Sequence, residues 1–164
     1  MSENWMQVRG WESLYEVSDE GRVRSKMREV SGGNGSRATR GGRVLKTANT
    51  GGYLHVSLSD APAVKNCRVH VLVAEAFLGI RPAGMNACHK DGDSTNNVPT
   101  NLYWGTQVQN MRDKVRHGTD RFALKRGHCP HGHQYDQANT YLTVTGSPRC
   151  KTCRRDGMRN RKAA

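Results

Sequence analysis

The chain has 164 residues, of which 35% are hydrophobic and 18 are Gly, so one large apolar core is excluded and small units held by other means are expected. The 26 Lys and Arg outnumber the 14 Asp and Glu, and the formal net charge of +12 favours a polyanionic partner, nucleic acid above all. We find no apolar run that could span a bilayer and no N-terminal secretion signal, and therefore expect no membrane partner. Five Cys at uneven spacings indicate metal-bound thiolates in a reducing compartment rather than a disulfide framework.

Short strands are predicted in the N-terminal third of the chain. Residues 14–17 and 22–25 are strand candidates separated by SDEG, which is a turn signal. Residues 53–58 alternate between apolar and polar side chains, as a half-buried strand does. Residues 31–42, SGGNGSRATRGG, are almost without core-forming side chains, and we expect a flexible loop there that orders against phosphates.

The period of the apolar residues then changes to that of a helix. Apolar side chains between residues 69 and 80 recur at spacings of three and four, which predicts a buried helix that stops at Gly79 or Pro82. His70 lies within this helix and is interpreted as a packed structural residue outside any site. Cys67, just before the helix, is interpreted as a small buried hydrophobe.

A strand, loop, strand and helix follow within a short stretch. Residues 86–90 and 101–104 are short strand candidates on either side of a polar loop. Thr106 is a good N-cap for a helix over residues 107–117, and Gly118 is a plausible stop. This order predicts that side chains on one face of the helix look back at the first strand.

Basic residues are concentrated on either side of this stretch. Residues 112–164 carry 13 Lys or Arg against four Asp or Glu, and residues 22–46 carry eight against the single acid Glu29. We interpret these segments as contacts to double-stranded DNA, and the alternative is that they are solvated faces and a loose tail. The candidate DNA-binding residues are Arg22, Arg24, Lys26, Arg37, Arg40, Arg43, Lys46, Arg112, Arg116, Arg154 and Arg155.

The polar stretch resembles the ββα-metal (His-Me finger) site of HNH endonucleases, most closely the phage and intron-encoded homing type. His89, Asn101 and Asn110 stand at intervals of 12 and 9 residues, which match that branch. Upstream, LYEVSDEGRVRS, GGYLHVSL and VHVLVAEAFLG resemble the DNA-binding module that precedes such motifs. The resemblance spans residues 5–118 and implies an endonuclease that cuts DNA phosphodiester bonds.

Elementary chemistry is consistent with that implication. A neutral His can activate water near pH 7, which makes His89 the candidate general base. A divalent ion can supply Lewis acidity at the phosphate, and amide oxygens suit Mg or Mn, so Asn110 is a candidate ligand. Asn101 is expected to hold the His loop, and Asp113 to be a second ligand or an outer partner. On the helix, Asn110, Asp113 and His117 share one face.

Cys88 departs from the family pattern, which often has Asp or His as a metal ligand at this position. A thiolate is a poor ligand for Mg, so three alternatives remain open. Asp113, Asp91 or water completes the shell, or the site prefers a softer ion, or the centre is degenerate. Asp91 and Asp93 also fit ordinary turn chemistry.

The C-terminal segment has its own metal signal. Cys129 and His133 are followed by Cys150 and Cys153, and two such tight pairs are what tetrahedral zinc requires. His128 and His131 are rival fourth ligands. The alternative is a disordered basic tail with incidental Cys. The arrangement also resembles the zinc-binding tail of some phage HNH proteins.

We therefore predict an α+β protein in three parts. Residues 1–60 form a small antiparallel β module that binds DNA, residues 61–118 a ββα-metal nuclease domain, and residues 119–164 a zinc-stapled basic segment. The predicted function is metal-dependent nicking or double-strand cutting of DNA by a monomer, with catalytic Mg or Mn and structural zinc. The alternative is a DNA-binding protein with a degenerate HNH centre. The resemblance also implies a phage-encoded protein in the cytoplasm of a bacterial host.

Overall fold

The structure is a computed structural model with helices and strands in mixed α+β order. It describes residues 2–31, 35–60, 62–119, 127–145 and 147–162. The chain forms two compact units, each described by itself below. The first consists of Met1–Ala83 and Ala87–Trp104, and the second of Gly84–Asn86 and Gly105–Ala164.

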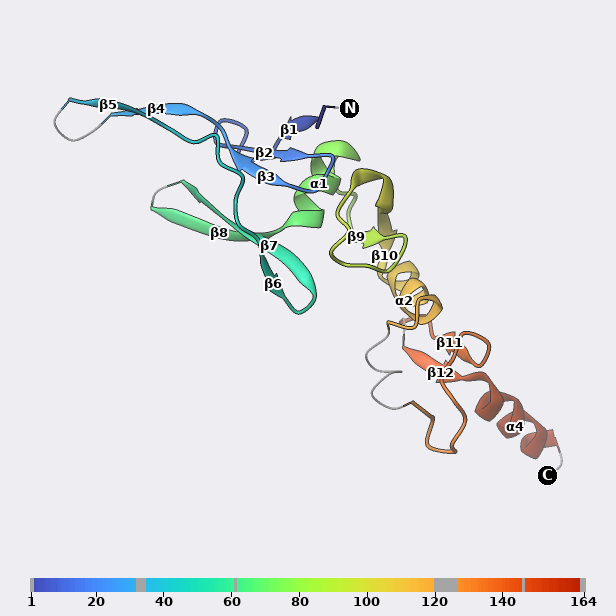
Figure 1. Ribbon diagram of the computed structural model, residues 1–164. Coiled ribbons are helices and arrows are strands. Elements are labelled where there is room, and N and C mark those ends of the chain that lie inside the picture. The colour runs from blue at the N-terminus through green and yellow to red at the C-terminus, as the bar shows by residue number, and fades with distance from the viewer. Residues whose placement is uncertain (1, 32–34, 61, 120–126, 146, 163–164) are drawn as a thin grey trace. The chain divides into compact units, whose positions relative to one another are not determined.

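The first unit begins with a three-stranded antiparallel sheet in the order β1-β2-β3 (Figure 1). Its strands are β1 (Trp5–Gln7), β2 (Tyr15–Ser18) and β3 (Val23–Ser25), so the two predicted N-terminal strands are confirmed. Gly21 takes a φ of 75° in the turn between β2 and β3, a conformation that favours glycine.

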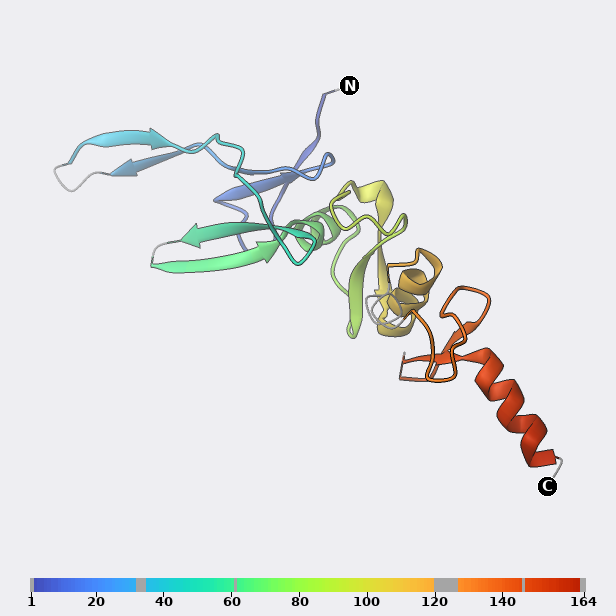
Figure 2. The same ribbon diagram turned by 60° about the horizontal axis from the view of Figure 1, so that its bottom comes forward.

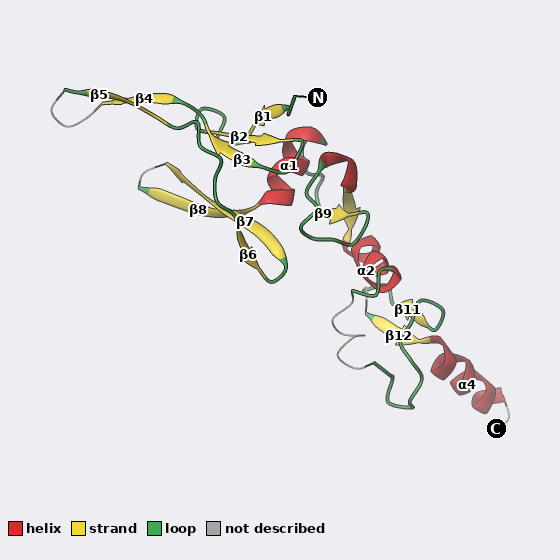
Figure 3. Ribbon diagram, in the orientation of Figure 1, coloured by secondary structure: helices red, strands yellow, loops and turns green. Residues whose placement is uncertain are grey.

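A β-hairpin follows where the sequence predicted a loop, and that prediction was wrong. Strands β4 (Arg28–Ser31) and β5 (Arg37–Arg40) pair antiparallel, with Val30 opposite Ala38 (Figure 3). The hairpin is ordered by its ladder of backbone hydrogen bonds and buries little side-chain surface. Its strands therefore have no apolar pattern from which they could be predicted. Residues 32–34 lie outside the described residues.

A second three-stranded sheet leads into the first helix. Strands β6 (Ala48–Thr50), β7 (Tyr53–Asp60) and β8 (Ala63–Arg68) are antiparallel, and β7 confirms the strand predicted from alternation. Helix α1 (Val69–Phe77) packs against β2, β7 and β8 (Figures 1 and 2). The helix is confirmed, and Gly79, with its φ of 86° directly after the C-cap Leu78, is the stop.

The hydrophobic core of the described residues lies within the first unit. It joins apolar side chains of β2, β3, β7, β8 and α1 with Val8 and Leu102. Its members are Val8, Tyr15, Val17, Val23, Val56, Leu58, Cys67, Val69, Leu72, Val73, Ala74 and Leu102. Cys67 is therefore a buried apolar residue as predicted, and burial raises the pKa of its thiol.

The polar stretch forms a β-ribbon with a long loop. Strand β9 (Met85–His89) pairs with β10 (Leu102–Thr106), and a 3-10 turn, η1 (Pro99–Asn101), precedes β10. Asn101 was expected in the second strand. It instead closes η1, because Pro99 has the φ that begins a helical turn.

Helix α2 (Gln107–Arg116) begins the longer part of the second unit. Thr106 accepts from the backbone N–H of Gln109, and the Gln109 side chain accepts from the backbone N–H of Thr106, so the predicted N-cap is a full capping box. Gly118 has a φ of 66° just beyond the helix, as a C-terminal stop does.

The rest of the second unit is small and has few buried side chains. Strands β11 (Thr140–Leu142) and β12 (Pro148–Cys150) pair antiparallel, and α4 (Lys151–Lys162) follows β12 directly (Figure 3). Among the described residues of this segment, only Cys129, Thr140 and Cys150 are buried. None of the described helices has the length and apolarity needed to cross a membrane.

Candidate active site and metal cluster

His89 is the last residue of β9, and its ring is held by a side chain from the following loop. The ring Nε2 lies 3.0 Å from Oδ1 of Asn97. With the amide oxygen as acceptor, Nε2 donates, and Nδ1 of the neutral ring is left as the basic nitrogen. The Nδ2 atom of Asn97 is buried and has no hydrogen-bond partner among the described residues. Asn97 is 3% exposed, so its side chain is a fixed part of the structure.

Asn101 ties the two ends of the same loop together. Its Nδ2 donates to Oδ1 of Asp91 at 2.9 Å and to the carbonyl oxygen of Asn96 at 2.9 Å. Its Oδ1 accepts from the backbone N–H of Asp91, and its carbonyl oxygen accepts from the backbone N–H of Lys90. These bonds clamp the chain directly after His89.

The two acidic residues of the loop are used inside it. Burial pushes the pKa of Asp91 upward, but hydrogen bonds from Asn101 and Asn96 outweigh that effect and leave the pKa below its ordinary value. Asp93 accepts from the side chain and the backbone N–H of Thr95, which lowers its pKa. Both carboxylates therefore act as turn-forming groups.

The loop rests on backbone from the two N-terminal sheets. Ser94 donates from its hydroxyl to the carbonyl oxygen of Gly52 at 2.6 Å, in the turn between β6 and β7. Gly21, in the β2–β3 turn, lies so close to Asn97 that a Cβ added at Gly21 would stand 3.0 Å from the Asn97 Cβ. The turns of the two N-terminal sheets thus support the loop that follows His89.

Two further residues beside His89 were missed by sequence reasoning. His70, interpreted above as a structural residue outside the site, is 3% exposed, and its ring centroid lies 5.0 Å from that of His89. Tyr53 lies 5.1 Å from His70 and 6.3 Å from His89 by the same measure. Burial, followed by the charges of His89, Arg68 and His55, lowers the pKa of His70 to about 3.

The remaining candidate residues of the centre are distributed over β9 and α2. Cys88 is 3% exposed on β9 and lies in the first unit. Asn110 and Asp113 are half-buried on α2, in the second unit. Asp113 forms an ion pair with Arg116 on the same helix. The donor set is chemically mixed, because an amide oxygen and a carboxylate suit a hard ion and a thiol does not.

A separate cluster brings four C-terminal side chains together. The ligand atoms of Cys129, His133, Cys150 and Cys153 all lie within 4.8 Å of one another. The Sγ atoms of Cys129 and Cys153 are 3.4 Å apart, too far for a disulfide, and Nδ1 of His133 lies 3.4 and 3.3 Å from them. Three sulfurs and one imidazole nitrogen at this spacing fit tetrahedral zinc.

Hydrogen bonds order the chain around this cluster. Asn139 donates from Nδ2 toward Cys150 Sγ at 3.4 Å and accepts on Oδ1 from the backbone and hydroxyl of Thr152. Burial raises the pKa of Cys150, but the backbone N–H of Cys153 and the Asn139 side chain outweigh it, so the pKa falls to about 7. Burial and the neighbouring Cys129 and Cys150 raise the pKa of Cys153 to about 12, as expected where thiols crowd without a cation.

The rival ligands lie outside the cluster. His128 and His131 are both exposed, and the four-residue group contains His133 instead. His133 follows a tight turn in which the Gly132 N–H donates to the carbonyl oxygen of Cys129 and the Cys129 N–H donates to that of His133. This turn returns the chain so that both side chains of the first pair meet.

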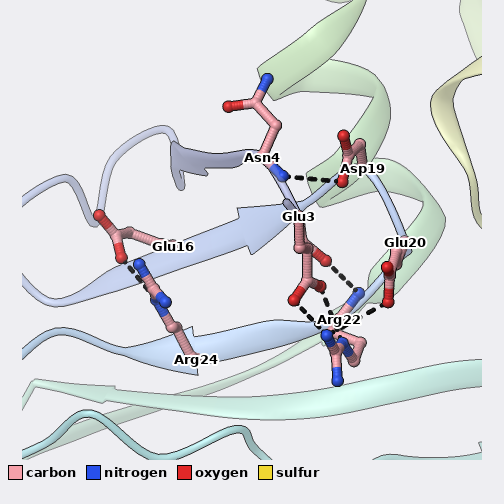
Figure 4. A network of polar contacts seen from close by, with 8 residues as sticks. Glu3, Asn4, Glu16, Asp19, Glu20, Arg22 and Arg24 are labelled. Carbon is pink, nitrogen blue, oxygen red and sulfur yellow. Dashed lines mark hydrogen bonds and ion pairs between the residues drawn. The ribbon is translucent and has the colours of Figure 1, made fainter. Parts of the chain in front are cut away.

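Six of the eight basic residues between positions 22 and 46 fall into two groups. Arg22 pairs with Glu3 and, at 3.2 Å, with Glu20 (Figure 4). Arg24 pairs with Glu16 at 2.8 Å (Figure 4), and its guanidinium lies 4.0 Å from the centre of the Trp5 ring. Carboxylates thus already neutralise both arginines.

Among the described residues, the second group has only one loose contact with a carboxylate. Arg37 is 81% exposed and has Glu29 at 3.9 Å as a loose partner. Arg40, Arg43 and Lys46 are exposed along β5 and the segment that follows it. The two groups therefore differ in their carboxylate partners, because Arg22 is also exposed but is paired with Glu3 and Glu20.

Comparison with known proteins identifies the class to which these features belong. Residues 67–112 match the HNH endonuclease family, and residues 3–59 match the NUMOD4 motif. The chain therefore contains an HNH endonuclease domain preceded by a NUMOD4 motif, and the resemblance drawn from the sequence is confirmed.

Two curated proteins and a solved structure are similar to this chain. DNA endonuclease I-HmuI of Bacillus phage SP01 is 33% identical over 116 residues, which cover 70% of this chain and 59% of that protein. The uncharacterized HNH endonuclease L245 of Acanthamoeba polyphaga mimivirus is 30% identical over 129 residues, which cover 78% of this chain and 33% of that protein.

The solved structure shares the fold. It is described as DNA binding and cleavage by the HNH homing endonuclease I-HmuI, and it superposes with a TM-score of 0.58 at 31% identity. The match covers 75% of this chain and 64% of that one. The present chain thus spans less than two thirds of the length of each of these relatives.

Proposed function

We propose that this protein is an HNH endonuclease that hydrolyses phosphodiester bonds of double-stranded DNA with the help of Mg or Mn. The observation that carries the proposal is the His89–Asn97 hydrogen bond inside the matched HNH segment. It leaves one ring nitrogen free to act as a base on a clamped, ordered loop. The similarity to a DNA endonuclease of a bacteriophage supports DNA as the substrate and the cytoplasm of a bacterial host as its location.

The chain's own residues have distinct parts in this mechanism. His89 takes a proton from the attacking water on Nδ1, while Asn97 holds Nε2 and keeps the ring in the required tautomer. Asn101 keeps the loop after His89 in one conformation through Asp91 and Asn96. None of these side chains has to move during proton transfer, which is the condition for effective general base catalysis.

HNH nucleases use divalent ions, and the proposed centre has residues that fit one. When bound, such an ion would supply Lewis acidity at the scissile phosphate and at the leaving 3′ oxygen. Asn110 would hold it through its amide oxygen, and Asp113 would be a second ligand or an outer partner that also binds Arg116. The Cys88 thiol does not fit Mg, and a softer divalent ion would tolerate it better.

We further propose that the second unit is stapled by zinc and that the protein acts as a monomer. The four ligands Cys129, His133, Cys150 and Cys153 support a structural ion, because they fill all positions of a tetrahedral shell. We propose that residues 1–60 bind DNA, residues 61–118 contain the nuclease centre, and residues 119–164 form the zinc-stapled basic part. DNA contacts would come from the second group of basic residues, from the exposed Arg112, Arg116, Arg154 and Arg155, and from the half-buried Lys26.

Supercoiled plasmid offers a direct test. Purified protein with Mg or Mn should convert it to nicked or linear product, and His89→Ala should abolish this while DNA affinity stays within about threefold, since the base contributes to the chemical step. His131→Ala, at an exposed His outside the metal cluster, is the matched control and should cleave normally. Equal cleavage by wild type and His89→Ala would refute the proposed mechanism.

Cys88 favours one other candidate function, a DNA-binding protein with a degenerate centre. The thiol stands where the family pattern often has a hard-ion ligand. In that case the wild-type protein would bind plasmid but would not cleave it, whichever divalent ion is added. The Cys88→Asp variant would then restore cleavage with Mg. Cleavage by the wild-type protein with Mg or Mn would exclude this alternative.

A further inference from the structure

His70 is the closest buried neighbour of His89 for which the proposed mechanism has no use. It lies in the first turn of α1 and is 3% exposed. Its ring meets that of His89 edge to face, with centroids 5.0 Å apart and planes at 61°. The ring of Tyr53, on β7, lies 5.1 Å from that of His70 and 6.3 Å from that of His89, so three rings from three elements form one cluster.

Packing of the helix does not explain an imidazole at this position. The other buried residues of α1, Val69, Leu72, Val73 and Ala74, belong to the apolar core, and His70 does not. Its Nδ1 is buried and has no hydrogen-bond partner among the described residues. A buried, unpaired polar atom costs free energy, so an apolar side chain of similar size would serve the core better.

The ring of His89 needs support that Asn97 alone cannot give. A single hydrogen bond at Nε2 fixes that nitrogen but leaves the ring free to pivot about the bond. A ring packed edge to face removes this freedom, because aromatic rings prefer that geometry and resist rotation out of it. Here the hydrogen bond and the ring contact act on the same imidazole.

We infer that His70 is a positioning residue for the HNH centre: its buried ring holds the His89 imidazole so that Nε2 stays on Asn97 and Nδ1 stays available to water. This inference rests on the proposed function of His89 as the general base. Tyr53 packs beside both imidazole rings, and the Arg68 guanidinium lies 5.3 Å from the centroid of the Tyr53 ring. The lowered pKa of His70 fits this part, since a neutral neighbour does not repel His89 when that ring gains a proton.

The test compares three substitutions of His70 with one control. His70→Ala removes the ring, His70→Leu fills the space without a flat ring, and His70→Phe keeps a ring without nitrogens. Val73→Ala, in the core of the same helix, is the control for loss of stability. Cleavage rates at saturating DNA, DNA affinity, and the 15N shifts of the His89 imidazole are measured for each folded variant.

A positioning role predicts a specific pattern. His70→Ala and His70→Leu should cleave roughly 10- to 100-fold more slowly at unchanged DNA affinity, the usual effect of a small misplacement. Their His89 15N shifts should report a mixture of tautomers in place of the Nε2–H form. His70→Phe should restore most of the rate and the single tautomer, and Val73→Ala should retain both.

Two results would overturn the inference. One is a rate for His70→Leu equal to that of Val73→Ala together with an unchanged His89 tautomer. The other is a His70→Phe variant as slow as His70→Ala, since the packing of an aromatic ring against His89 would then have no effect on the rate. If the wild-type protein does not cleave, the proposed function fails, and the tautomer measurement still decides the inference.

Discussion

His89 and Asn97 are joined by a hydrogen bond of 3.0 Å between the ring Nε2 and the side-chain oxygen. This contact decides which ring nitrogen can accept a proton, because the amide oxygen has no hydrogen to give. Asn97 in turn rests on the backbone of the N-terminal sheet at Gly21. The chemistry of the centre is thus connected to the NUMOD4 part of the chain through a single buried side chain.

Asn97→Leu should slow cleavage, because it removes the acceptor while keeping the volume. We expect a loss of roughly 10- to 100-fold in the single-turnover rate with little change in DNA affinity. Asn97→Asp keeps an acceptor oxygen and should retain more activity than Asn97→Leu. A Leu variant as fast as wild type would show that the tautomer is set elsewhere.

Gly21→Ala should destabilise the first unit more than Gly10→Ala. Both glycines have positive φ, 75° and 73°, so both substitutions incur the strain of a left-handed residue, about 1–2 kcal/mol. At Gly21 the new Cβ would also meet the Asn97 Cβ at 3.0 Å and its carbonyl oxygen at 3.2 Å, whereas Gly10 has no neighbour within 4 Å. Crowding of this kind typically adds about 1–3 kcal/mol.

Urea unfolding of the two glycine variants isolates that contact. The backbone strain is the same in both variants and cancels. The difference between their unfolding free energies therefore measures the cost of crowding Asn97 at position 21. Only Gly21→Ala should also slow cleavage. Equal free energies of unfolding and equal rates would mean that the loop does not depend on this turn.

Zinc should be present at about one ion per chain, as a four-ligand structural site requires. Cys150→Ser with Cys153→Ser should release it and unfold the second unit, because zinc supplies on the order of 10 kcal/mol to such small folds. Elemental analysis and circular dichroism check both effects. Cys67→Ser is the control, since Cys67 lies in the core of the first unit and outside the cluster. Protein prepared without chelator and free of zinc would contradict the prediction.

Salt dependence should distinguish the two groups of basic residues. Replacing Arg37, Arg40 and Arg43 with Gln should make the log–log slope of affinity against salt shallower by about 0.9 for each lost phosphate contact. Arg24→Gln is the comparison, because Arg24 is already paired with Glu16 and covers Trp5. It should lower stability and leave the slope almost unchanged. A full slope in the triple variant would mean that these arginines do not touch DNA.

Acid should weaken folding through His70. Its folded pKa of about 3 lies below the ordinary value of 6.5, so the unfolded chain binds the proton first. Stability is therefore complete above pH 6.5 and is lost as the pH falls toward 3, at about 1.4 kcal/mol per pH unit. Between pH 7 and 5 the loss should be about 2 kcal/mol by urea unfolding. His70→Phe should remove this part of the pH dependence, and His128→Phe, at an exposed position, should not.

Local signals in the sequence were sufficient for much of the fold. Alternation predicted β7, helical spacing predicted α1, and Thr106 marked the start of α2, because each signal depends on neighbouring residues alone. The paired spacing of the C-terminal Cys and His likewise predicted which four side chains would meet. In each of these features the signal lies in residues that are close together in the sequence.

Features that leave no pattern of side chains along the sequence could not be predicted. The β4–β5 hairpin is held by its backbone ladder and has no apolar stripe to reveal it. The contact of His70 with His89 joins α1 to β9, and no local pattern distinguishes such a His from an ordinary core residue. In the same way, only the fold shows that Glu3 and Glu16 neutralise Arg22 and Arg24.

The chain from Asn101 to Asn110 has no loop residues between its elements. Asn101 ends η1, β10 follows at once, and Thr106 is both the last residue of β10 and the N-cap of α2. A single codon inserted or deleted after Thr106 would turn Asn110 by about 100° around the helix axis. A gene of this kind can therefore accept substitutions within the nine residues that follow Asn101 far more readily than any change in their number.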